Sequence, residues 1–110
     1  MLPKKERIKK GSEIKEIIRS KTNSFSTPLL YLLAKENSGN HNRLAIICSK
    51  KLGKAVVRNK IRRVLMQAYL KNKHIIKKNN DIVIIPRSEI YRVNDAIYEL
   101  EVGFKALKIC

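Results

Sequence analysis

The segment 54–70 restricts the fold of this chain more than any other. Its apolar residues recur at helical spacing and form one stripe, made of Val57, Ile61, Val64, Leu65 and Ala68. Short apolar runs of strand length precede and follow it, RLAIICS at 43–49 and DIVIIP at 81–86. The unbroken run DIVIIP is typical of a central strand that is buried on both faces. Strand, helix and strand in this order predict a β-α-β unit with parallel strands.

The flanking segments predict three more elements. We expect a first helix over 12–20 with Ser12 as its N-cap, and a last helix over 95–107 capped by Asn94. LLYLLA predicts a strand over 29–35, paired antiparallel with 43–49, and TNSFSTP at 22–28 predicts a turn. The expected order is α-β-β-α-β-α, an α+β fold with helices on a single-layer sheet.

The chain has 110 residues, 44% of them apolar, which predicts one domain with a real core. We expect the basic stretch 1–10 to be mobile, Cys48 to be a buried apolar residue and Cys110 to be a free thiol. Neither a signal peptide nor an apolar run long enough to span a bilayer is evident, and His41 and His74 stand outside any metal-ligand spacing. We therefore expect a cytoplasmic protein that binds no metal through its side chains.

The formal net charge is +16, and such an excess indicates a polyanionic partner. Nucleic acid is the first candidate, while an anionic membrane and an acidic protein are the alternatives. The charge is also unevenly distributed, because no carboxylate occurs between Glu36 and Asp81 while twelve lysines and arginines do. An ordinary solvated helix mixes charges of both signs, so this segment is predicted to meet phosphate groups.

A helical projection of 54–70 places Arg58, Asn59, Arg62 and Arg63 opposite the apolar stripe, with Met66 among them. The preceding loop SKKLGKA adds Lys50, Lys51 and Lys54. Gly53 allows a tight turn there, and the N–H groups of the helix start can meet a phosphate.

The stretch SKKLGKAVVRNKIRRVLMQAYL, residues 49–70, resembles the signature of the bacterial ribonuclease P protein subunit. RIKKGSEIKEII is similar to the basic start and first helix of that family. LLYLL, RLAIICS and DIVIIPR are similar to its strands, so the resemblance covers nearly the whole chain.

The resemblance implies a subunit that binds ribonuclease P RNA and the 5′ leader of precursor tRNA. The RNA with its own Mg²⁺ would remove the leader, and no catalytic residue, membrane or small-molecule substrate is expected of the protein. A left-handed β-α-β crossover is also implied, against the usual right-handed rule. Carried over by position, the RNA-binding residues are Lys50, Lys51, Lys54, Arg58, Asn59, Arg62 and Arg63; Gly53 and Ala55 form the turn and helix start; and Ile14, Ile18 and Tyr31 line the leader cleft.

Two departures from the family pattern involve three positions. Ile14 and Ile18 stand where phenylalanines are usual, and they could equally serve the core; Met66 stands where the last arginine of the motif is common. We interpret Met66 as an apolar gap in a cationic surface, away from the core. Two other functions stay open on sequence grounds, a small structural RNA-binding protein of ribosomal type and a DNA-binding module that uses helix 54–70 in a major groove.

Overall fold

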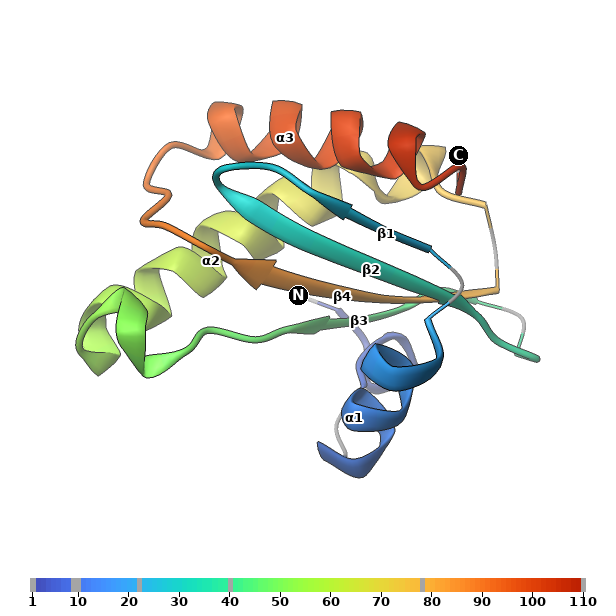
Figure 1. Ribbon diagram of the computed structural model, residues 1–110. Coiled ribbons are helices and arrows are strands. Elements are labelled where there is room, and N and C mark those ends of the chain that lie inside the picture. The colour runs from blue at the N-terminus through green and yellow to red at the C-terminus, as the bar shows by residue number, and fades with distance from the viewer. Residues whose placement is uncertain (1, 9–10, 22, 40, 78, 110) are drawn as a thin grey trace.

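A four-stranded sheet lies between helices in the computed structural model, which describes residues 2–8, 11–21, 23–39, 41–77 and 79–109 (Figure 1). The main elements in chain order are α1 (Gly11–Ser20), β1 (Asn23–Ser26), β2 (Leu30–Glu36), β3 (Arg43–Ile46), α2 (Ala55–Asn72), β4 (Asn80–Pro86) and α3 (Val93–Ala106). Three short 3-10 helices accompany them: η1 (Lys4–Glu6), η2 (Lys50–Leu52) and η3 (Lys73–Ile75). The α+β class with a single sheet is confirmed.

The strand order is β1-β2-β4-β3. β4 pairs antiparallel with β2, where Leu33 faces Val83, and parallel with β3, where Ala45 faces Val83. The predicted parallel pairing within the β-α-β unit and the central place of DIVIIP are therefore confirmed. The predicted antiparallel pair of 29–35 with 43–49 is wrong, because β4 lies between these two strands. The left-handed sense of the crossover stays a prediction.

Strand β1 corrects the prediction of a turn over 22–28. Asn23 to Ser26 pair antiparallel with β2, and only the tip at 27–29 turns. The Thr27 hydroxyl accepts hydrogen bonds from the N–H groups of Leu30 at 2.9 Å and Leu29 at 3.2 Å, which closes this hairpin. The sheet therefore has one more strand than the expected order, with Phe25 as the apolar residue of an otherwise polar edge.

The two faces of the sheet bury separate cores. Alternate residues of the strands, such as Leu32 and Ile84, pack with α2 and α3 in the larger core. The residues between them, such as Leu33 and Val83, pack with Ile17 of α1 in the smaller core. Figure 1 shows α1 apart from the other two helices, over one end of the sheet. Because α1 is short, the structure has one extensively covered face and one partly covered face.

The helix caps differ from the predictions. Ser12 lies inside the first turn of α1, which begins at Gly11, and Asn94 lies inside α3, whose N-cap residue is Arg92. Gly103 of α3 is buried, and a Cβ there would lie 2.0 Å from the Leu32 Cδ1 atom. This close approach to the sheet explains a glycine within a helix.

The N-terminal stretch 1–10 is packed where it is described, and its expected mobility stays a prediction. Leu2 and Ile8 are buried, and Arg7 forms an isolated parallel bridge with Leu44 of β3. The Ile8 N–H donates to the Leu44 carbonyl at 3.0 Å. Residues 1, 9 and 10 lie outside the described part.

Candidate nucleic-acid interface

The predicted RNA-binding residues form one surface on η2 and α2, which we call the basic face. Arg58 is half-buried and the others are exposed; the face consists of Lys50, Lys51, Lys54, Arg58, Asn59, Arg62 and Arg63. α2 contains no acidic residue. The cations of this helix repel one another, and this repulsion destabilises the helix in the free protein. A bound polyanion would neutralise the cations and remove the repulsion.

The turn before α2 depends on Gly53. Its φ of 135° lies in the region that side chains rarely adopt, and its N–H donates to the Lys50 carbonyl at 3.2 Å. A Cβ at this position would also approach the Val57 side chain at 3.3 Å. α2 then begins at Ala55, and its N-cap, Lys54, makes no side-chain capping bond. The helix start therefore retains N–H groups that can donate hydrogen bonds to an anion.

A hydrogen bond organises part of the basic face itself. The Arg62 Nη1 donates to the Asn59 Oδ1 at 3.1 Å, so the amide holds this guanidinium along the helix. The Arg58 Nε is buried and has no hydrogen-bond partner among the described residues. Beneath them, Cys48 is buried and free, as predicted, and burial raises the pKa of its thiol against the opposing effect of the nearby arginines. Cys110 lies outside the described residues.

Met66 is not placed as predicted. It is half-buried and packs against the larger core, and it lines a pocket together with Arg62. The buried face of α2 includes Tyr69, which is 1% exposed and meets Phe104 edge-on with ring centroids 6.3 Å apart. This face extends further toward Met66 than the apolar stripe alone indicated, so Met66 lies at its border.

The three predicted leader-cleft residues lie on the same side of the sheet. Ile14 and Ile18 of α1 and Tyr31 of β2 are half-buried and pack against the smaller core. Each thus has a packing role and retains exposed surface. Only Ile14 of these three lines the pocket that contains Met66.

A buried ion pair that the sequence did not reveal fixes α1 to the sheet. Arg43 of β3 donates twice to the Asp81 carboxylate of β4, both at 2.8 Å, and once to Glu13 of α1 at 3.0 Å. Asn37 adds a third hydrogen bond to Asp81 at 2.8 Å. The hydrogen bond with Asp81 raises the pKa of the Arg43 guanidinium above its ordinary value. Arg43 is therefore a structural cation, although its charge counted toward the basic segment in the sequence.

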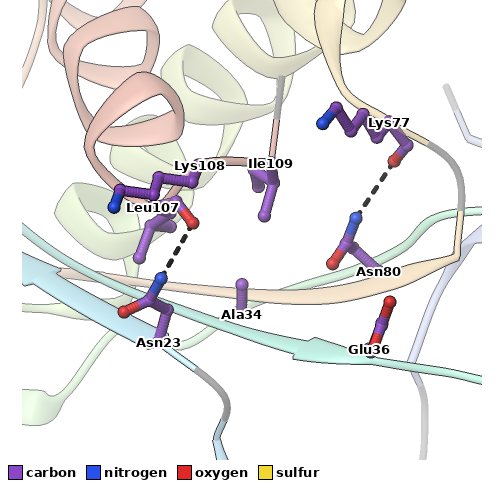
Figure 2. A pocket seen from close by; sticks show the side chains of 8 residues that line it. All are labelled: Asn23, Ala34, Glu36, Lys77, Asn80, Leu107, Lys108 and Ile109. Atoms are coloured by element: carbon purple, nitrogen blue, oxygen red, sulfur yellow. Dashed lines mark hydrogen bonds between the residues drawn. The ribbon is translucent and has the colours of Figure 1, made fainter.

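A second depression of about 300 Å³ lies where the end of α3 meets the sheet, and Figure 2 shows its lining. Asn23 Nδ2 donates to the Leu107 carbonyl at 3.0 Å, and Asn80 Nδ2 donates to the Lys77 carbonyl at 3.1 Å. These two amide groups hold neighbouring backbone segments together. We therefore assign this depression a structural role.

Within the described ranges, no three His, Cys, Asp or Glu side chains come together in a way that could hold a metal ion. The helices described here include none that is long and apolar enough to cross a bilayer.

Known proteins resemble this chain over most of its length. The family model described as Ribonuclease P matches residues 2–108. The ribonuclease P protein component of Clostridium acetobutylicum is 40% identical over 87 residues, which are 77% of this chain and 72% of the relative. That of Geobacillus kaustophilus is 34% identical, over 86% of this chain and 78% of the relative.

Solved structures agree. The RNase P protein of Staphylococcus aureus is 31% identical with a TM-score of 0.83, over 94% of this chain and 96% of that one. The RNase P protein of Thermotoga maritima is 30% identical with a TM-score of 0.68, over 94% and 88%. These likenesses favour ribonuclease P over the ribosomal-type and DNA-binding alternatives. The chain belongs to the ribonuclease P protein family.

Proposed function

We propose that this protein is the RNA-binding subunit of ribonuclease P, and that its basic face docks on the ribonuclease P RNA during 5′ processing of precursor tRNA. The observation that carries this role is the run of exposed cations along η2 and α2 without a carboxylate among them. Guanidinium groups offer planar pairs of donors to phosphates, and Asn59 can reach a ribose hydroxyl or a base edge.

We further propose that the partly covered side of the sheet receives the 5′ leader. Ile14, Ile18 and Tyr31 would offer apolar and aromatic surface to unpaired bases there. Isoleucine packs on a base or sugar but does not stack as an aromatic ring does. Tyr31 would therefore contribute more to leader affinity than either isoleucine.

The chemistry of phosphodiester hydrolysis would belong to the RNA. We propose that the Mg²⁺ ions of the reaction are held by the RNA, and we assign no step of the reaction to an ion held by the protein. The protein would raise the affinity of the RNA for its substrate and reduce repulsion between the phosphate chains.

Binding to ribonuclease P RNA at several KCl concentrations tests the basic face. The log–log slope should amount to several units, because each neutralised phosphate releases counterions. Arg62→Gln and Arg63→Gln should each weaken binding and reduce the slope by about one unit. Lys105→Gln on α3 removes the same charge elsewhere and should change neither quantity. A shallow slope, or equal effects of all three variants, would refute this assignment.

A further inference from the structure

A pocket opens at the outer edge of strand β3, where the N-terminal segment bridges to Leu44, beside the basic face. It is lined by residues of the N-terminal segment, α1, β3 and α2, among them Arg7, Ile14, Leu44, Ile46, Arg62 and Met66, and its volume is about 330 Å³. We call it the β3-edge pocket. β3 is the last strand of the sheet on this side, so the pocket lies where the two faces of the sheet meet.

The lining is mostly apolar, and three of its apolar side chains are only half-buried. Ile14 packs against the smaller core, whereas Ile46 and Met66 pack against the larger one, and all three are half-buried. Met66 is unbranched and polarisable, so it adapts to flat or irregular ligand surfaces. The pocket thus offers an apolar wall that the fold does not itself cover.

Two guanidinium groups accompany this wall. Arg62 belongs to the basic face, and Arg7 comes from the N-terminal segment that bridges to Leu44. The Arg7 Nε is buried without a hydrogen-bond partner among the described residues, and none of the ion pairs found there includes Arg7. A buried donor without a partner is costly, and an acceptor on a ligand would satisfy it.

These features agree with the chemistry of one nucleotide. The lining includes no carboxylate, which disfavours a cationic ligand, and its two arginines favour a phosphate. The size is at the lower end of small-ligand sites, which suits a single base with its ribose. Unpaired bases in RNA complexes stack on aromatic side chains or arginine planes while cations bind the backbone, and here the apolar wall would take the place of the aromatic ring.

We propose that the β3-edge pocket binds one unpaired nucleotide of an RNA, with its base against Met66 and Ile14 and its phosphate near Arg7 and Arg62. This inference rests on the proposed function, because the pocket borders the basic face. It also changes the role of Met66, which becomes a contact for a base at the border of the core. The nucleotide can come from the ribonuclease P RNA or from the precursor leader, two sources of the same chemistry.

The variant Met66→Arg separates this role from electrostatics alone. It adds a charge beside the basic face but fills the pocket, so a purely electrostatic surface would bind RNA at least as tightly. If the pocket holds a base, Met66→Arg weakens binding by about tenfold or more, as loss of a base contact does. Met66→Leu keeps the apolar wall and should stay within about twofold of the wild type.

Two assays locate the source of the nucleotide. Affinity of the protein for ribonuclease P RNA reports a nucleotide of that RNA. Affinity of the assembled holoenzyme for precursor tRNA, relative to mature tRNA, reports a nucleotide of the leader. A tenfold loss for Met66→Arg in either assay, with Met66→Leu unaffected, supports the pocket and identifies the source. Wild-type affinity of Met66→Arg in both assays overturns it.

A second variant keeps the proposal testable if Met66→Arg does not fold, which its circular dichroism would reveal. Arg7→Lys retains the charge but removes the Nε donor and the planar fork. Arg7→Lys should lower the affinity in the same assay as Met66→Arg, whereas unchanged affinity in both assays would overturn the proposal. If the wild-type protein itself binds no ribonuclease P RNA, the proposed function fails and the pocket's role with it.

Discussion

Replacing Arg43 with methionine removes the cation that pairs with a buried carboxylate. Asp81 has a side chain that is 6% exposed, and Arg43, with 29% exposed, supplies two of its hydrogen bonds. Removing one partner of a buried pair costs about 3–5 kcal/mol, because the other charge stays buried. Since Arg43 partly reaches solvent and Asn37 remains bonded to Asp81, we expect a loss of about 3 kcal/mol.

Urea unfolding followed by circular dichroism measures this loss, and Tm should fall by about 12 °C or more. The control is Lys105→Met, which breaks an exposed ion pair with Glu101 and should cost less than about 1 kcal/mol. Adding Asp81→Asn to Arg43→Met should restore much of the stability, because the buried charge is then absent. A loss below about 1 kcal/mol for Arg43→Met, or no recovery in the double variant, would refute this reasoning.

Three further predictions concern buried groups. Gly103→Ala should lower the free energy of unfolding in urea by about 1–3 kcal/mol, because the new Cβ would overlap the buried Leu32 side chain. This loss should outweigh the better helix propensity of alanine, and a gain in stability would contradict the prediction. Burial raises the pKa of Tyr69 to about 12, above the value near 10 of an unfolded tyrosine. The contribution of the neutral Tyr69 side chain to stability is therefore complete below about pH 10 and is lost as the pH rises toward 12. The wild-type protein should therefore lose about 1.4 kcal/mol more per pH unit than Tyr69→Phe in that window, and parallel curves would exclude the effect. The Cys48 thiol, whose pKa burial raises, should react slowly with a thiol reagent at pH 8 in a Cys110→Ser background and rapidly in urea; equal rates would mean that the site is open.

The hydrophobic pattern of the sequence predicts the helix and the central strand of the β-α-β unit. The helix at 54–70 and the central strand at 81–86 were recognisable because each presents a continuous apolar surface of the right length. Strand β1 was missed because Phe25 is its one apolar residue, and an edge strand needs no more. The strand order was missed because β4 is inserted between two strands that precede it in the chain, a long-range choice.

The candidate site was predictable in the same uneven way. That Arg58, Asn59, Arg62 and Arg63 lie together follows from their spacing on one helix, and α2 contains all four. The place of Met66 depends on long-range packing: it packs against the larger core and lines a pocket with Leu44 and Ile46 of β3. Arg7 bridges to Leu44, 37 positions away, and Arg43 binds Asp81, 38 positions away. A pattern along the chain does not reveal contacts at such separations.

The central claim is that this protein assists an RNA in removing the 5′ leader of precursor tRNA. The most direct test is leader removal by the cognate ribonuclease P RNA at low Mg²⁺, with and without the protein, at a substrate concentration below the KM of the RNA alone. We expect the wild-type protein to raise the cleavage rate markedly and the double variant with Arg62→Gln and Arg63→Gln to raise it much less. An equal rate with and without the wild-type protein would contradict the account.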